Sequence, residues 1–268
     1  MFNAAKQNRS VGGHDSRRIC IQQRTLARDP ARGRNGHGAR SHFWRSLAAA
    51  ILDNPDLGGA VAFQIGERLG HDAAECRQFA QIAREVFLAA PDLVEAASLD
   101  LKAIADHDPA TTALLPPLLN FKGYIALQAF RVSNWLWRKN RIDLALLLQS
   151  ESSNLLQVSI HPSARIGTSV FLDHATGIIV GAFAEIGDEV TIMQNVTVGR
   201  KDTPAGGAPR IGRRVLLSTG ATILGDISIG DFARIGAGAL VTEDVPAGCT
   251  AVGVPARVTN CPQAGLAG

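Results

Sequence analysis

The second half of the chain repeats an aliphatic residue every six positions, usually followed by a small or polar residue, with two interruptions. The repeated positions are Ile160, Ile166, Leu172, Ile178, Val180, Ile186, Ile192, Val198, Ile211, Leu217, Ile223, Ile229, Ile235 and Val241. A six-residue period of Ile, Leu or Val suits a triangular coil in which each side is a short strand and the aliphatic side chains form a stacked core. We therefore predict a parallel β-helix of about four or five coils.

The preceding segment, from Ser41 to about Gln157, carries apolar residues at helical spacing. In the run Phe121, Ile125, Ala129, Val132 and Leu136, steps of four, four, three and four place the side chains on one helix face. Breaks at proline, glycine and asparagine divide the segment into about six to eight predicted helices, which form one bundle. The breaks are Asn54-Pro55, Gly58-Gly59, Gly70, Pro91, Asp108-Pro109 and Pro116-Pro117.

Composition changes near residue 158, from helical patterns with charge to residues rich in Gly, Ile, Val, Thr and Ala. This change predicts two domains of class α+β, an N-terminal helical bundle followed by a parallel β-helix of hexapeptide repeats. The predicted segments are a basic, poorly ordered leader (1–44), a helical domain (45–157), a β-helix domain (158–258) and a short tail (259–268). A hydrophobic content of 46% excludes wholesale disorder.

Positive charge is concentrated at the N-terminus, although the formal net charge is only +3. The first 45 residues hold ten Lys or Arg against Asp15 and Asp29. A nucleic-acid-binding arm or a transit peptide has this composition, and so does a solvated tail. We favour the tail, and predict no nucleic-acid partner, because no aromatic residues are interleaved with the charges to stack on bases.

The cysteines and the hydropathy bear on location. The four cysteines, Cys20, Cys76, Cys249 and Cys261, show no paired spacing that indicates zinc or a disulfide framework, so a reducing cytoplasm fits best. No apolar stretch reaches the roughly 18 to 20 residues that span a bilayer, and no signal-peptide core precedes residue 45. We expect no association with a membrane.

One segment of the repeats contains titratable groups, the run Leu172-Asp173-His174-Ala175-Thr176-Gly177-Ile178. All seven histidines of the chain lie at or before His174, so the rest of the β-helix has none. An imidazole with a pKa near 6.5 accepts a proton at neutral pH and returns it, which suits activation of an acceptor hydroxyl. His174 is the candidate base, with a lone histidine that merely fills the solenoid as the alternative.

The second interruption separates Val198 from Ile211 by thirteen residues where six are expected, so a loop leaves the solenoid there. Its residues, 199–210, are glycine-rich and basic. Loops on a rigid scaffold commonly cover a binding groove, and the alternative is an idle surface turn.

The motifs together resemble the bacterial and plant serine O-acetyltransferases. In the repeats the likeness is carried by Asp-His-Ala-Thr-Gly at 173–177, Ile-His-Pro at 160–162 and Val-Pro-Ala-Arg at 254–257. In the helical part it is carried by Asp-Pro-Ala at 108–110, Pro-Leu-Leu at 117–119, Lys-Gly at 122–123, Ala-Leu-Gln-Ala-Phe-Arg at 126–131 and Trp-Leu-Trp at 135–137. The likeness covers about residues 45 to 258 and implies a left-handed β-helix.

The resemblance implies acetyl transfer from acetyl-CoA to the hydroxyl of L-serine, with no metal. His174 matches the family's base, and Asp173 and Asp108, the latter followed by Pro109, match carboxylates that face the substrate. Without the family, Asp108 reads equally well as a helix N-cap before Pro109. Acetyl-CoA in the family lies between β-helices of a trimer, along residues that match Gly199, Thr219 and Ala237. We expect a homotrimer or a dimer of trimers.

Three departures from the family pattern affect chemistry. Ser159 stands where the family has the Asp that orients the catalytic imidazole, and serine supplies no charge to stabilise an imidazolium. Gly207 and Ala208 replace an Arg that binds the serine carboxylate and a second His. Arg200, Lys201 and Arg210 are the candidate replacements for the lost cation. Ser-Thr-Gly at 218–220 replaces the usual Gly-Ala-Gly, which narrows the expected acetyl-CoA groove.

Three other functions remain as alternatives. One is an acetyltransferase with a different hydroxyl or amine acceptor, favoured by the loss of the carboxylate-binding Arg. Another is a non-catalytic scaffold homologue, against which His174 argues. A zinc carbonic anhydrase needs three histidine ligands, and the solenoid offers only His161 and His174.

Two regulatory properties of the family are expected to be weak here. The tail, Gln-Ala-Gly-Leu-Ala-Gly at 263–268, lacks the terminal Ile with which relatives bind O-acetylserine sulfhydrylase. Cysteine inhibition should also be weak, because cysteine uses the pocket altered at Gly207 and Ala208.

Overall fold

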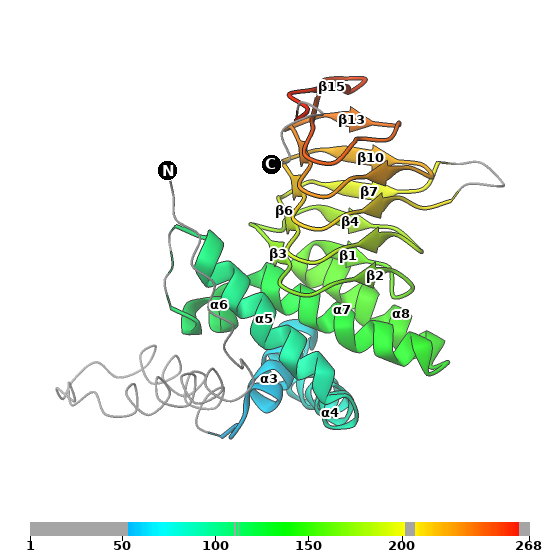
Figure 1. Cartoon of the computed structure of the whole chain (residues 1–268). Helices are drawn as coiled ribbons and strands as arrows, with labels where there is room; N and C mark the ends of the chain where they lie inside the picture. Colours follow the sequence, from blue (N-terminus) through cyan, green and yellow to red (C-terminus); the bar gives the residue numbers. More distant parts are fainter. Residues whose placement is uncertain (1–52, 110, 112, 202–206, 263–268) are drawn as a thin grey trace.

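The computed structural model describes residues 53–109, 111, 113–201 and 207–262, so the basic leader, the centre of the loop and the last six residues lie outside it. The described part consists of helices packed against one end of a β-solenoid (Figure 1). The helices are α3 (Leu57–Leu69), α4 (Ala73–Ala89), α5 (Pro91–His107), α6 (Leu115–Asn120), α7 (Lys122–Arg138) and α8 (Ile142–Glu151), and a π-helical turn η1 (Ser152–Leu156) follows.

Local sequence explains where several of these helices begin. The Asp56 carboxylate accepts a hydrogen bond from the Gly59 amide at 2.7 Å and caps α3, and Asp72 caps α4 in the same way. Helix α5 starts with Pro91, whose missing amide hydrogen is not needed in a first turn. On α7, the predicted apolar face is confirmed, because Ile125, Ala129, Val132 and Leu136 are all buried.

The solenoid consists of three sheets, and its strands run parallel until the final hairpin. Sheet A contains β1 (Val158–Ile160), β4 (Ile178–Val180), β7 (Thr197–Gly199), β10 (Thr222–Leu224) and β13 (Leu240–Val241). Sheet B contains β2 (Arg165–Ile166), β5 (Glu185–Ile186), β8 (Arg210–Ile211) and β11 (Ser228–Ile229). Sheet C contains β3 (Phe171–Leu172), β6 (Thr191–Ile192), β9 (Leu216–Leu217), β12 (Arg234–Ile235), β14 (Thr250–Val252) and β15 (Arg257–Thr259).

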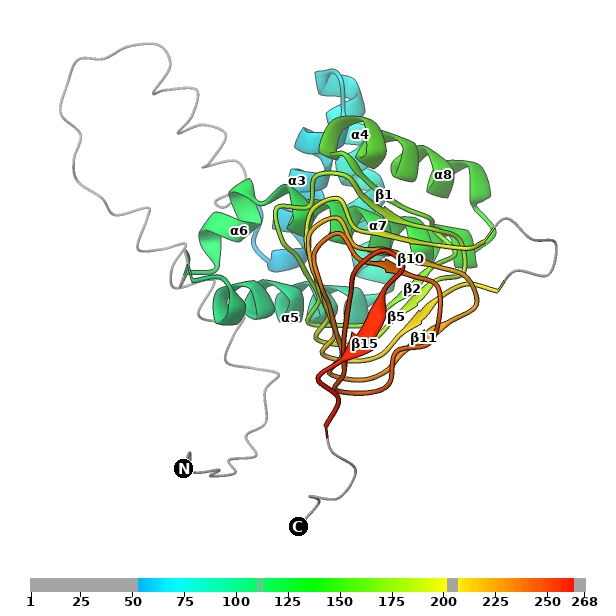
Figure 2. The same ribbon diagram turned by 90° about the horizontal axis from the view of Figure 1, so that it is seen from above.

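The strand register confirms the hexapeptide prediction. On sheet B, for example, Ile166, Ile186, Ile211 and Ile229 stack one above another, and on sheet C the same is true of Leu172, Ile192, Leu217 and Ile235. All of these side chains except the part-buried Ile166 are buried. Seen from above, the coils superimpose as a triangle with α7 and α8 beneath them (Figure 2).

A buried ion pair joins the helices to the first coil. Asp100 of α5 is 0% exposed, and its carboxylate accepts hydrogen bonds from Arg131 and Gln128 of α7 and from the amide of Val170, the residue before β3. Arg131 also donates to the Gly167 carbonyl at 2.8 Å. Burial raises the pKa of the Asp100 carboxyl, and Arg131 opposes that rise. Two helices and the solenoid therefore share one polar network.

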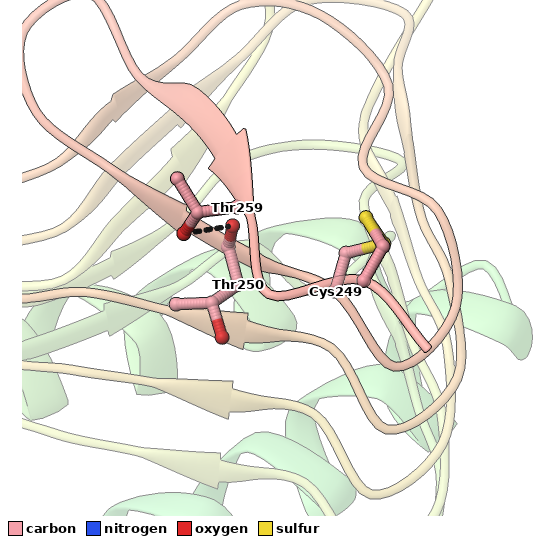
Figure 3. Close-up of a disulfide and its surroundings, with 4 residues drawn as sticks. Cys249, Thr250 and Thr259 are labelled. Carbon is pink, nitrogen blue, oxygen red and sulfur yellow. Dashed lines mark hydrogen bonds between the residues drawn. A yellow bond between two sulfur atoms is a disulfide. The ribbon is translucent and has the colours of Figure 1, made fainter. Parts of the chain in front are cut away.

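The last coil is closed by a hairpin and a disulfide. Strand β15 turns back and pairs antiparallel with β14, and Cys249 is bonded to Cys261 with a Cα–Cα distance of 4.1 Å. The Thr259 hydroxyl donates to the Thr250 carbonyl in the same hairpin (Figure 3). Our expectation of unpaired cysteines was wrong for these two, because the hairpin brings together residues that are twelve positions apart. Cys76 is a free thiol.

Breaking the Asp100–Arg131 pair should destabilise the protein strongly. We expect Arg131→Met to lower the free energy of unfolding by about 3–5 kcal/mol, because it leaves a buried carboxylate without its cation. Urea unfolding at fixed protein concentration measures this loss. The double variant Asp100→Leu/Arg131→Met should recover part of it, and a loss in the double variant that equals the sum of the two single losses would contradict a coupled pair.

Removing the disulfide should loosen the final hairpin. Closing a loop of this length restricts the unfolded chain by about 3 kcal/mol in the chain-entropy model, so Cys261→Ser should raise amide exchange across β14 and β15. Hydrogen exchange read by mass spectrometry reports this change, with Cys76→Ser as the matched control. Unchanged exchange in Cys261→Ser would show that the bond does not hold the hairpin.

Candidate functional site

The corner between sheets C and A is longer in the first coil than in the coils above it. Inward residues that flank this corner are six positions apart in later coils, as from Ile192 to Val198, but eight apart from Leu172 to Val180. Backbone hydrogen bonds link the Asn195 amide to Thr176, the Gly220 amide to Gln194 and the Gly238 amide to Thr219.

These bonds align the corners residue by residue. Thr176, Gln194 and Thr219 occupy equivalent positions, and Gly177, Asn195, Gly220 and Gly238 all have positive φ. The two residues without a counterpart are His174 and Ala175. The first interruption of the repeat is thus an insertion of two residues. One of them is His174, the only histidine that follows Pro162 in the sequence.

His174 is held in an unusual backbone conformation and is open to solvent. Its φ is 54° and that of Ala175 is 60°, values that residues with a Cβ seldom adopt. The His174 side chain is 73% exposed, and its Nε2 lies 3.7 Å from Oδ1 of Asp173. An exposed imidazole beside a carboxylate can accept a proton from a bound hydroxyl, and the carboxylate favours the imidazolium that forms.

Helix α7 supports this corner from the helical side. A Cβ on Gly123 would lie 2.3 Å from the Leu172 carbonyl oxygen and 2.9 Å from the Ala175 Cβ. Only glycine therefore allows α7 to approach the turn this closely.

The three predicted acetyl-CoA residues do not lie on one edge. Thr219 and Ala237 stand at the same corner as His174, and the Gly238 amide donates to the Thr219 carbonyl at 2.9 Å. Gly199 ends β7 at the other end of sheet A, where the loop begins. The structure therefore brings Thr219 and Ala237 toward the His174 edge and leaves Gly199 with the loop.

The predicted substrate-binding cations lie at the base of the loop. Nη1 of Arg210 pairs with the Asp226 carboxylate at 2.8 Å, and the aliphatic part of Lys201 lies beside Gly225. Arg200 is exposed. None of these contacts reaches His174. A Cβ on Gly207 would lie 2.4 Å from the Asp226 Cγ, so Asp226 occupies the space into which a side chain at 207 would extend.

Asp108 and Pro109 follow the end of α5. Asp108 is the C-cap of α5, its amide donates to the Ile104 carbonyl at 2.8 Å, and its carbonyl accepts from the Thr111 amide at 3.2 Å. The alternative of Asp108 as a helix N-cap is therefore wrong, because the helix precedes it. Pro109 is exposed.

Ser159, which replaces the family's orienting Asp, has a partner that the sequence did not suggest. Nε2 of Gln149 in α8 donates to the Ser159 hydroxyl at 3.3 Å. The helical spacing of α8 gave no sign that Gln149 would reach a strand of the solenoid. His161, of the Ile-His-Pro motif, is half-buried against the edge of Trp137, and burial lowers its pKa.

The described residues contain neither a cluster of metal-ligating side chains nor a membrane-spanning helix. Within residues 53–109, 111, 113–201 and 207–262, no group of three or more His, Cys, Asp or Glu side chains is placed to hold a metal ion. In that same part of the chain, none of the helices has the length and apolar character that crossing a bilayer requires.

A parallel solenoid of hexapeptide coils with an exposed histidine on a lengthened corner defines an acyltransferase of the hexapeptide-repeat class. The family model "Serine acetyltransferase, N-terminal" matches residues 41–129. The serine acetyltransferase of Salmonella typhimurium is 41% identical over 215 residues, which are 80% of this chain and 79% of the relative. The chain belongs to the serine acetyltransferase family.

Solved structures agree with this assignment. Soybean serine acetyltransferase in complex with serine superimposes with a TM-score of 0.84 at 38% identity, covering 92% of this chain and all of that one. A serine acetyltransferase in complex with CoA gives 0.81 at 34% identity and covers 91% and 98%. The predicted fold class, a helical bundle followed by a left-handed parallel β-helix, is confirmed.

Proposed function

We propose that this protein transfers the acetyl group of acetyl-CoA to the hydroxyl of L-serine and so makes O-acetylserine for cysteine biosynthesis. The observation that carries the proposal is the insertion that presents His174, with Asp173 beside it, on the edge shared with Thr219 and Ala237. Relatives solved with serine and with CoA support both substrates.

The proposed reaction uses one base, His174, and one carboxylate, Asp173. His174 takes the proton of the serine hydroxyl as its oxygen attacks the thioester carbonyl, and a tetrahedral intermediate forms. As the C–S bond breaks, the imidazolium returns the proton to the coenzyme A sulfur. Asp173 stabilises the imidazolium between these steps, by a modest amount because both side chains are solvated.

We also propose that the working unit is a homotrimer, with a dimer of trimers as the larger assembly. His174 and the base of the loop lie at opposite ends of sheet A, which at about 3.3 Å per residue separates them by at least about 10 Å. A neighbouring solenoid brings the loop of one copy to the His174 edge of the next. Ile179, 48% exposed on the outer face of sheet A, is suited to burial in such a contact.

The proposed location is the cytoplasm, as predicted. Cys249 and Cys261 are bonded to each other, so the cysteines do not support this location.

A second candidate function is acetyl transfer to an acceptor other than serine. It is favoured by Gly207, because the family's carboxylate-binding Arg has no counterpart there and Asp226 takes up the space. Arg210, a candidate replacement, already pairs with Asp226.

The decisive experiment is thiol release from acetyl-CoA with L-serine. We expect His174→Ala to lower serine-dependent release by about 10²–10⁴-fold, because the base is lost while coenzyme A binding is kept. Calorimetric binding of coenzyme A verifies the second part. His71→Ala, an exposed histidine paired with Glu151, is the matched control. Release that survives in His174→Ala would remove the proposed base, and release with other amino acids or sugars alone would favour the second candidate.

Placing an arginine at position 207, as the family has, should improve serine binding only if Asp226 is also replaced by a smaller residue. We expect Gly207→Arg/Asp226→Ser to lower KM for serine by about tenfold or more through a charge-assisted pair with the carboxylate. Gly207→Arg alone should not, because Asp226 blocks the side chain. Asp226→Ser alone controls for loss of the Arg210 pair. A single Gly207→Arg that performs as well as the double variant would show that Asp226 is not the obstacle.

A further inference from the structure

The turn that carries His174 contains two residues that the other corners do not have. His174 and Ala175 both have positive φ, and among the described residues no other two neighbours share that conformation. Such residues keep it only where their surroundings fix it. The ends of the turn are bonded to the coil above, through Asp173 and Thr176, and to the Gln157 carbonyl below, through the Gly177 amide. These bonds leave out the two inserted residues, whose further support comes from helix α7.

Helix α7 supplies that contact through its first turn. Nζ of Lys122 donates to the Thr176 hydroxyl at 2.6 Å, next to the close approach of Gly123 to Leu172 and Ala175. The Thr176 amide in turn donates to the His174 carbonyl at 2.8 Å. Two successive hydrogen bonds thus connect the Lys122 ammonium to the backbone of His174.

The position of Lys122 on its helix is unfavourable for a cation. It is the first residue of α7, where the helix dipole disfavours positive charge, and the first turn contains no acidic side chain. Helix stability therefore does not account for a lysine at this place, whereas the contact with Thr176 does.

We propose that Lys122 is a positioning residue for acetyl transfer, holding Thr176 so that the His174 imidazole keeps one orientation toward the acceptor hydroxyl. This inference rests on the proposed function, because it assigns Lys122 a role in the same reaction. Lys122 touches neither substrate nor reacting atoms in this role.

The kinetic test compares Lys122→Met, Lys122→Arg and Thr176→Val, with Lys102→Met, an exposed lysine of α5, as control. We expect Lys122→Met to lower kcat for serine about tenfold and to change KM for acetyl-CoA less than about twofold, since orientation and not cofactor binding is lost. Lys122→Arg should restore most of kcat, and Lys122→Met/Thr176→Val should be no slower than the slower single variant. An unchanged kcat, or additive losses in the double variant, would overturn the proposal.

A second readout is independent of activity. Hydrogen exchange of the substrate-free protein should be faster at residues 173–178 in Lys122→Met than in wild type, and unchanged in Lys102→Met. Two results would contradict a positioning role for Lys122. In one, Lys122→Met exchanges faster at residues 173–178 but keeps its kcat; in the other, neither its exchange nor its kcat changes. If the wild-type protein does not acetylate serine at all, the proposed function fails. The role of Lys122 is then still decided by two readouts, the hydrogen exchange of residues 173–178 and the kcat measured with whichever acceptor the protein uses.

Discussion

The buried pair between Asp100 and Arg131 is the interaction on which the arrangement of this molecule depends. A solenoid cannot leave the core of its first coil exposed, and here α7 covers it. Covering by apolar contact alone would allow a helix to slide or rotate. Arg131 bonds both Asp100 of α5 and the Gly167 carbonyl of the first coil, and Asp100 bonds the Val170 amide. A buried carboxylate that lost these partners would leave its desolvation penalty uncompensated. The two helices and the first coil are therefore held in one relative position.

That fixed position explains why the reactive corner belongs to the first coil. Corners higher in the stack have other corners as their neighbours and are not contacted by α7, so an insertion there would project without a helix to support it. At the first coil the neighbour is a helix whose sequence is free to fit an irregular turn. Gly123 lets α7 approach the turn closely because it has no side chain, and the long side chain of Lys122 reaches the Thr176 hydroxyl. The helical domain therefore contributes contacts to the proposed site and does not merely cap the solenoid.

The sequence predicted the features that repeat and missed those that depend on a single distant contact. The aliphatic period led to the inward residues of all three sheets, and the helical period to the buried face of α7. Both interruptions were recognised, but the aliphatic period placed the first between Ile178 and Val180, whereas the inserted residues are His174 and Ala175. Three contacts were not foreseen: Cys249 with Cys261, Gln149 with Ser159, and Asp226 against Gly207. Each joins residues whose spacing has no period, so only the folded chain brings them together.

The departures from the family are confined to particular parts of the structure. The turn at 173–177 keeps the family motif and is held by α7, whereas Gly207 and Ala208 lie at the base of a loop at the opposite end of sheet A, beside the Arg210–Asp226 pair. In the described part of the chain no hydrogen bond or ion pair joins these two regions, and they rest on different supports. Under the proposed function, a change in how the acceptor carboxylate is bound therefore need not disturb the proposed base, His174. Ser159 is the exception, because it lies on β1 and is bonded to Gln149 of α8, inside the junction between the helices and the solenoid. In the proposed reaction, this neutral hydrogen bond stands where the family resemblance implies an orienting charge, so the proposal assigns the orientation of the His174 imidazole to the backbone of its turn, and hence to α7.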